Sequence, residues 1–148
     1  AETVRNGVSV LLEQGLAEAQ DNILVHDAAR CCLPAEALTR LLDEAGENDE
    51  GGILAIPVAD TLKRADGSHH IDETVARAGL WQAQTPQLFQ TALLNRALSV
   101  DDLSEITDEA SAVEKLGIRP RLVQGDTRNL KLTLPQDEYI VRLLLKAV

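Results

Sequence analysis

The stretch NILVHDAAR, residues 22–30, decides how this chain is expected to fold. Its first part is a short apolar run, which predicts a strand over residues 22–26. Asp27 and Arg30 follow just past the end of that strand, where open α/β sheets bind their ligands. The stretch therefore predicts a sheet of the α/β class with a polar site beyond the end of one strand.

Helical and strand-like patterns alternate on both sides of this stretch. Apolar residues at helical spacing predict a helix from the first residues that ends by Gly15, and another over residues 34–45 with Pro34 near its first turn. The run GGILAIPV, residues 51–58, is typical of a strand covered on both faces. The alternation predicts a mainly parallel sheet flanked by helices.

The second half of the chain is expected to add shorter elements. Residues 87–98 and 108–116 have helical patterns, and Thr107 is placed to cap the second helix, with Gly117 at its end. Residues 121–124 and 130–133 are expected as short strands, and Pro135 opens a last helix. The apolar stripe of that helix consists of Tyr139, Ile140, Leu143, Leu144 and Val148.

Residues 60–76 interrupt the pattern with polar and charged side chains. Asp66 and Gly67 mark the turn of a projecting β-arm that has little core of its own. An arm of this kind is explained if it packs on a neighbouring subunit, and a solvated hairpin is the alternative. His69 and His70 are assigned to the solvated turn and not to a metal.

Composition and charge exclude several classes of protein. The chain has 148 residues, 45% hydrophobic and 26% charged, which is ordinary for one soluble domain. A net charge of -10 opposes a nucleic-acid backbone, so no nucleic-acid partner is expected. No apolar run is long enough to span a bilayer, and the first residues are too polar for a signal peptide, which predicts a cytoplasmic protein without a membrane partner.

Three residue types allow further inferences. The adjacent Cys31 and Cys32 have the spacing of neither a zinc knuckle nor a CxxC pair and are interpreted as small, partly buried side chains. The absence of methionine predicts a processed or truncated chain. Asp27 offers a carboxylate that can hold Mg²⁺, and Arg30 offers a planar guanidinium group that can bind an oxyanion. A surface ion pair between Asp27 and Arg30 is the alternative.

Five motifs occur in order along the chain. They are VHDAAR at residues 25–30, PVADTLKR at 57–64, GLWQAQTPQLF at 79–89, TDEAS at 107–111 and GDTRNLKLTLPQD at 125–137. Together they resemble the 2-C-methyl-D-erythritol 4-phosphate cytidylyltransferases, over residues 1–148. The resemblance implies the C-terminal part of one Rossmann-like nucleotidyltransferase domain, with residues 60–76 as the dimerisation arm of a homodimer.

The resemblance also implies a reaction. The phosphate of 2-C-methyl-D-erythritol 4-phosphate would attack the α-phosphorus of CTP, with Mg²⁺ assisting, to give pyrophosphate and 4-diphosphocytidyl-2-C-methyl-D-erythritol for the non-mevalonate isoprenoid pathway. No covalent enzyme intermediate is implied, so alignment and charge neutralisation carry the catalysis.

Site residues carry over from the family position by position. Arg77 and Lys131 match the two catalytic cations, and Asp27 matches the carboxylate that contacts metal and nucleotide. Residues matching the substrate and nucleotide pocket are Thr3 near the cytosine, Ala28 and Arg30 at the ribose and erythritol, and the hydroxyls of Thr61, Thr85, Thr107 and Thr133. In the family, Arg77 and Thr61 act across a dimer.

The chain departs from the family in two places. A glycine-rich PAAGxGxR stretch and a PKQY-like lysine motif are absent from these residues, and Cys31 stands where the family usually has proline. An N-terminally truncated fold with negligible activity on its own is therefore expected. The alternatives are a related ribitol-phosphate cytidylyltransferase and a non-catalytic dimerisation or ligand-binding module.

Overall fold

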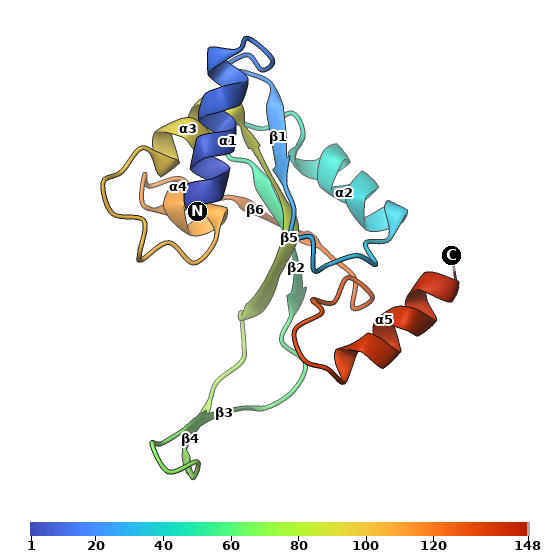
Figure 1. Cartoon of the computed structure of the whole chain (residues 1–148). Coiled ribbons are helices and arrows are strands. Elements are labelled where there is room, and N and C mark those ends of the chain that lie inside the picture. Colours follow the sequence, from blue (N-terminus) through green and yellow to red (C-terminus); the bar gives the residue numbers. More distant parts are fainter. Residues whose placement is uncertain (148) are drawn as a thin grey trace.

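The computed structural model describes residues 1–147 and shows helices packed on a four-stranded sheet, with a hairpin that projects from it (Figure 1). The helices are α1 (Glu2–Glu13), α2 (Ala35–Ala45), α3 (Thr91–Leu98), α4 (Glu109–Glu114) and α5 (Asp137–Lys146). The strands are β1 (Asn22–Val25), β2 (Gly52–Pro57), β3 (Leu62–Ala65), β4 (Ile71–Val75), β5 (Trp81–Gln90) and β6 (Arg121–Gln124). The expected α/β class is confirmed.

The sheet is mixed, which corrects the expectation of a mainly parallel one. Its strand order is β1-β5-β2-β6, in which β5 pairs antiparallel with both β1 and β2, while β2 and β6 are parallel. Strands β1, β2 and β6 therefore share one direction, and β5 runs against them. The sequence-based prediction did not identify β5 as a strand.

The predicted helix over residues 87–98 is wrong in its first four residues, which belong to β5. Helix α3 begins at Thr91. Polar residues hide the strand in the sequence, because Gln84, Thr85 and Gln87 are buried and hydrogen-bonded within the domain. The ladder to β1 and β2 outweighs the weak helical periodicity.

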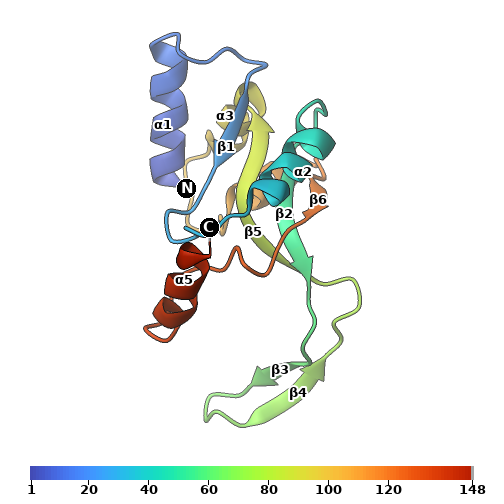
Figure 2. The same ribbon diagram turned by 90° about the vertical axis from the view of Figure 1, so that its right-hand side faces the viewer.

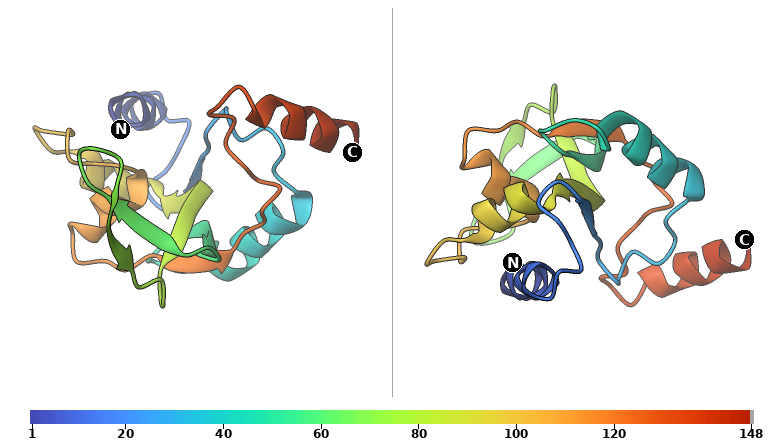
Figure 3. Two further views of the ribbon diagram at one scale, coloured as in Figure 1. Left: turned by 90° about the horizontal axis from the view of Figure 1, so that it is seen from below. Right: turned by 90° about the horizontal axis from the view of Figure 1, so that it is seen from above.

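Alternate side chains of the central strands pack on opposite faces of the sheet, as the two-residue period of a strand requires. On one face, Ile53 and Phe89 pack with α1, α3 and α4. On the other, Leu54 and Leu88 pack against Leu41 of α2. The views from below and from above in Figure 3 show these helices on the two sides of the sheet, with α5 set apart from both groups.

The C-terminal segment differs from its prediction in two ways. Residues 130–133 form no strand; instead, Leu132 N donates to Ala29 O at 2.9 Å. Helix α5 buries Val141, whereas the predicted stripe is largely solvent-facing, since Tyr139 is 71% exposed. Val148 lies outside the described residues. None of the described helices has the length and apolar character needed to cross a membrane.

The cap of α4 is Asp108 and not the predicted Thr107. Asp108 Oδ1 accepts from Ser111 N at 2.8 Å, which completes a capping box with Ser111. The extended backbone of Asp108 places its carboxylate over the first turn of the helix, so the prediction was one residue early. The helix ends at Glu114, two residues before its predicted end at Leu116, and Gly117 follows in the left-handed conformation with φ 83°.

The predicted arm is confirmed as a hairpin of β3 and β4 that forms a sheet of its own, away from the main sheet (Figure 2). Its side chains are almost all exposed. Asp66 Oδ1 accepts from the backbone N–H groups of Ser68 and His70 and so shapes the turn. The hairpin has no buried core among the described residues, so no packing within it fixes its position relative to the main sheet.

Substitution of Gly51 by alanine is expected to destabilise the fold strongly. Gly51 has φ +75°, and an added Cβ would overlap the Phe89 ring and lie 2.5 Å from Leu88 O. We expect Gly51→Ala to lower the free energy of unfolding by about 2 kcal/mol in urea denaturation. Gly7→Ala is the control, because nothing lies within 4 Å there, and it is expected to stabilise α1 by about 0.5 kcal/mol. Equal effects at both positions would contradict the packing described here.

Candidate active site

Two cations from distant parts of the chain meet one carboxylate beyond the end of β1. Asp27 Oδ2 lies 3.7 Å from Arg30 Nε and 3.5 Å from Lys131 Nζ. The Arg30 side chain is 13% exposed, whereas those of Asp27 and Lys131 are 41% and 50% exposed. The cluster therefore has one anchored cation and two groups that solvent or a ligand can reach.

The segment after β6 is held against the loop after β1. Arg30 Nη1 donates to Asn129 O at 2.7 Å, and the backbone hydrogen bond from Leu132 N to Ala29 O is formed three residues further along the same segment. Lys131 stands between these two contacts in the chain. The ammonium of Lys131 therefore reaches Asp27 from a segment that is fixed on both sides.

Asn129 is the buried centre of this arrangement. Its side chain is fully buried, and Nδ2 donates to Thr85 O at 2.8 Å and to Gln84 Oε1 at 3.2 Å. Gln84 Nε2 in turn donates to Asp126 O at 3.0 Å. Asn129 thus joins β5 to the segment that carries Lys131, while its own Oδ1 is buried and has no hydrogen-bond partner among the described residues.

His26 and Thr85 fix the loop that carries Asp27. Thr85 Oγ1 accepts from Asp27 N at 2.9 Å and lies 2.9 Å from His26 Nδ1. His26 Nε2 is 2.9 Å from Arg30 O, and since a carbonyl only accepts, Nε2 is the donor. In neutral His26, Nδ1 then accepts from the Thr85 hydroxyl. Both polar groups of His26 are used to hold the loop between residues 26 and 30.

Burial and neighbouring charges tune the ionisable groups here. Burial lowers the pKa of Arg30, and the charge of Asp27 opposes that change. The turn that leads to Asn129 contains Asp126, whose pKa is lowered to about 2, mainly by its hydrogen bond from the Arg128 side chain. Arg128 Nη2 and Asp126 Oδ2 are 2.8 Å apart, so this turn carries its own ion pair.

A cavity of about 320 Å³ opens beside the two cations. It is lined by Arg30 and Lys131 together with Ile56, Gln82, Gln84 and Thr127. A hollow with two cations on its wall can hold phosphate oxygens, because bidentate and ammonium donors both bind them. It also lies where the carboxyl ends of β1 and β2 face, which is the ligand-binding edge of open α/β sheets.

The structure brings four of the predicted site residues together: Asp27, Arg30, Thr85 and Lys131. Ala28 is exposed within the same loop, and Thr133 Oγ1 donates to Lys131 O at 3.3 Å. Thr85 is only 7% exposed, with its hydroxyl engaged by the protein. The cluster therefore includes uncharged residues in addition to Asp27, Arg30 and Lys131.

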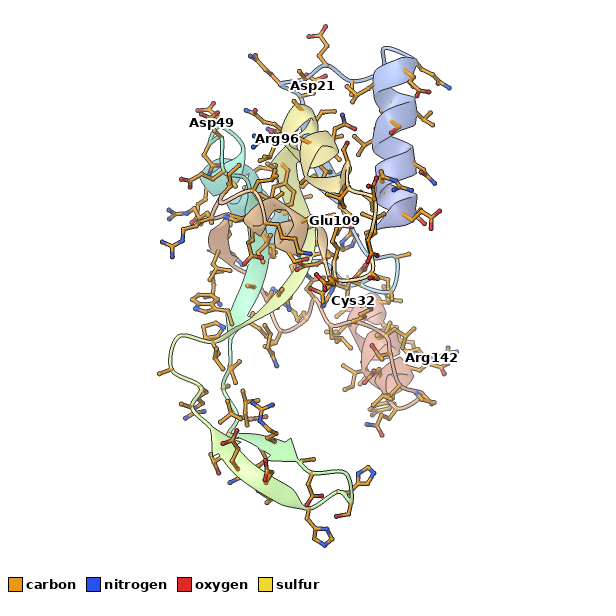
Figure 4. All side chains as sticks on the ribbon, turned by 90° about the vertical axis from the view of Figure 1, so that its left-hand side faces the viewer. Asp21, Cys32, Asp49, Arg96, Glu109 and Arg142 are labelled. Carbon is orange, nitrogen blue, oxygen red and sulfur yellow. The ribbon has the colours of Figure 1, made fainter. Side chains whose placement is uncertain are left out.

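The remaining predicted residues lie elsewhere in the chain. Thr3 is exposed in the first turn of α1, and Thr107 is exposed just before α4. Thr61 and Arg77 flank the base of the β3–β4 hairpin, whose side chains point into solvent (Figure 4). Among residues 1–147, neither Thr61 nor Arg77 forms a side-chain hydrogen bond or ion pair with the Asp27 cluster.

Sequence reasoning missed three residues that build the site, namely His26, Gln84 and Asn129. Each lies in one of the motifs and near a residue that was predicted: His26 in VHDAAR, Gln84 in GLWQAQTPQLF and Asn129 in GDTRNLKLTLPQD. Their roles depend on hydrogen bonds between residues 42 to 99 positions apart, or on a loop closure after β1. Adjacency to a predicted ligand residue was the signal that could have found them.

A known protein family matches nearly the whole chain. Residues 1–147 match the family described as 2-C-methyl-D-erythritol 4-phosphate cytidylyltransferase. The chain belongs to this family. Curated cytidylyltransferases of the family include one from Neisseria gonorrhoeae, 74% identical over the whole chain, and one from Thiobacillus denitrificans, 53% identical over 98% of it. The chain spans about 64% and 63% of the lengths of these two relatives.

Solved structures of cytidylyltransferases share the fold. A crystal structure of 4-diphosphocytidyl-2C-methyl-D-erythritol synthase matches 97% of this chain and 66% of its own, with a TM-score of 0.93 and 72% identity. The Francisella tularensis cytidylyltransferase matches 95% of this chain and 65% of its own, with a TM-score of 0.84 and 32% identity. The predicted Rossmann-like nucleotidyltransferase fold is confirmed.

Proposed function

We propose that a protein containing this chain, together with the further length that its relatives have, transfers a cytidylyl group from CTP to 2-C-methyl-D-erythritol 4-phosphate. The products are pyrophosphate and 4-diphosphocytidyl-2-C-methyl-D-erythritol, an intermediate of the non-mevalonate isoprenoid pathway in the cytoplasm. Membership of the cytidylyltransferase family supports this reaction. The observation that carries it is the approach of Arg30 and Lys131 to Asp27 Oδ2 from segments about 100 residues apart.

The cluster suits phosphoryl-type transfer because it offers charge and no nucleophile with a base. Lys131 would leave Asp27 for the substrate phosphate and neutralise charge that grows during attack on the α-phosphorus. Arg30, held by Asn129 O, would orient the bound ligand beside it. Anchoring matters here because a misplaced donor loses most of its effect on the transition state.

Asp27 is the residue that would hold Mg²⁺. Its carboxylate is 41% exposed, and both protein cations contact Oδ2. One carboxylate with phosphate oxygens and waters is a usual magnesium environment. When bound, the ion neutralises phosphate charge. The residues of this chain fit that group, and among the described residues no cluster of three or more His, Cys, Asp or Glu forms a different metal site.

The arm supplies the homodimer contact in this proposal. Thr61 and Arg77 flank the base of a hairpin whose side chains have no partner core in their own chain. We place both residues at the substrate site of the neighbouring subunit, where Arg77 is the second catalytic cation. The rest of the substrate and nucleotide pocket consists, as the family resemblance implies, of Thr3, Ala28, Thr107 and Thr133. Thr85 contributes through its hydroxyl, which accepts a hydrogen bond from Asp27 N.

Subunit complementation is expected if Arg77 acts across the dimer. Full-length Arg77→Ala and Lys131→Ala variants should each be inactive, but their mixture should recover about a quarter of the parental activity, because half the dimers are mixed and each has one intact site. The assay follows pyrophosphate release with CTP, Mg²⁺ and the erythritol phosphate after the subunits are exchanged.

The outcomes separate the parts of this proposal. A mixture no more active than the two variants alone places Arg77 in the site of its own subunit and contradicts the cross-dimer role. A parental protein that forms no product, or that prefers ribitol phosphate, contradicts the proposed substrate. Each variant mixed with itself controls for gains that come from the exchange procedure.

A further inference from the structure

The thiols of Cys31 and Cys32 have no part in the proposed transfer, although they directly follow Arg30 in the chain. Both are free; Cys31 is exposed and Cys32 is half-buried. Figure 4 shows Cys32 near α5, and its Sγ lies 3.9 Å from Val141 O in that helix. The contact is a weak one, since a thiol is a poor donor.

The two thiols share a cavity of about 650 Å³ between the start of α2 and α5. Its apolar wall is formed by Leu33, Pro34, Leu144 and Leu145, while Glu36 and Arg128 contribute polar groups. The cavity therefore combines two soft sulfur ligands with a surface that suits an apolar group.

The number of ligands limits what the thiols can bind. Zinc takes four protein ligands in a structural site. Among the described residues, no group of three or more His, Cys, Asp or Glu side chains is placed so that it could hold a metal ion. Two sulfurs alone suit a soft centre that brings its own third substituent. Trivalent arsenic bearing one organic group has this character, because it forms two bonds to sulfur and keeps its carbon substituent.

We propose that Cys31 and Cys32 form a binding site for trivalent organoarsenicals, in which arsenic bridges the two sulfurs and its organic group lies in the apolar cavity. For an arsenoxide, two As–S bonds form and the bond to oxygen breaks. The two thiol protons leave with that oxygen as water. Arsenic stays trivalent, so no oxidant or reductant is needed.

The order of bond formation follows from exposure. Cys31 is reached from solvent, so it forms the first As–S bond. Burial, followed by the neighbouring Cys31 thiol, raises the pKa of Cys32, which keeps this thiol protonated until arsenic is delivered beside it. The second bond then forms within one molecule, where the effective concentration of the thiol is high. Cys32 only has to give up its weak contact with Val141.

The test uses phenylarsine oxide with this chain and its Cys31→Ser and Cys32→Ser variants. Intact-mass measurement should show one phenylarsenic group on the parent, with two hydrogens lost, that survives excess monothiol and is removed by a dithiol. Each variant keeps one thiol and should bind about a hundredfold more weakly, because the chelate is lost. Circular dichroism confirms that the serine variants are folded.

A parent that releases the arsenical to monothiol contradicts the proposal, as does a single-serine variant that holds it as firmly as the parent. The apolar cavity has a separate readout. Replacing Leu144 by asparagine should weaken phenylarsine oxide binding more than binding of methylarsenous acid, whose substituent is small. Equal weakening of both would contradict the placement of the organic group. None of these measurements depends on cytidylyl transfer, so their failure leaves the proposed function untouched.

Discussion

Replacement of Lys131 by glutamine is expected to lower kcat/KM for cytidylyl transfer about 100-fold or more, because one charged donor to the transition state is lost. Glutamine keeps much of the length of the side chain and removes the charge. Lys131 is half exposed, and within residues 1–147 its ion pair is with Asp27, so the fold should tolerate the change. Initial rates with CTP, Mg²⁺ and the erythritol phosphate measure the effect in the full-length protein.

Lys115→Gln is the matched control for Lys131→Gln. Lys115 is 51% exposed and also forms an ion pair, with Glu105 at 3.3 Å. The two lysines therefore differ mainly in their position in the fold. Its replacement should leave kcat/KM unchanged within about twofold, as surface ion pairs contribute little. Equal losses from both substitutions would show a general charge effect and would contradict a specific role for Lys131.

Replacement of Asn129 by alanine is expected to cost about 3 kcal/mol of folding stability, because two buried acceptors lose their donor and a small cavity is left. The acceptors are Thr85 O and Gln84 Oε1, both in the central strand β5. Urea denaturation measures the loss. Asn22→Ala is the control, since Asn22 donates one exposed hydrogen bond to Gly46 O, and it should cost well under half as much.

A second readout separates positioning from stability in the Asn129 variant. Arg30 Nη1 donates a hydrogen bond to Asn129 O, so a displaced backbone at residue 129 should raise the KM for the substrate under conditions where the variant is still folded. If Asn129→Ala loses stability but keeps KM and kcat, Asn129 supports the fold alone. If it loses neither, the buried network described here is wrong.

Elements whose structure depends on neighbouring residues in the chain could be predicted from the sequence. The apolar runs of β1 and β2 and the turn of the arm needed no knowledge of distant contacts. Strand β5 failed because Gln84, Thr85 and Gln87 interrupt its apolar character, and their burial depends on partners elsewhere in the chain. The stripe on α5 misled for the opposite reason, as the apolar side chains of Tyr139, Ile140 and Leu143 remain exposed.

The candidate site divides in the same way. Asp27 and Arg30 could be predicted because they follow a strand, and their side chains interact three residues apart. Lys131 has no local signal and was found through the family resemblance alone. Asn129 could not be predicted, since its role rests on contacts 44 and 45 residues away. Charged residues that directly follow a strand are thus visible in the sequence, whereas Lys131 and the buried amides that hold the site have no local signal.

Transfer of label from CTP tests the central claim most directly. The full-length protein is incubated with Mg²⁺, 2-C-methyl-D-erythritol 4-phosphate and CTP labelled at the α-phosphate, and the products are separated. The account predicts that the label appears in the diphosphocytidyl product, with unlabelled pyrophosphate, and that Lys131→Gln abolishes nearly all of it. Label that stays in CTP, or that Lys131→Gln transfers as fast as the parent, would contradict cytidylyl transfer at the Asp27–Arg30–Lys131 cluster.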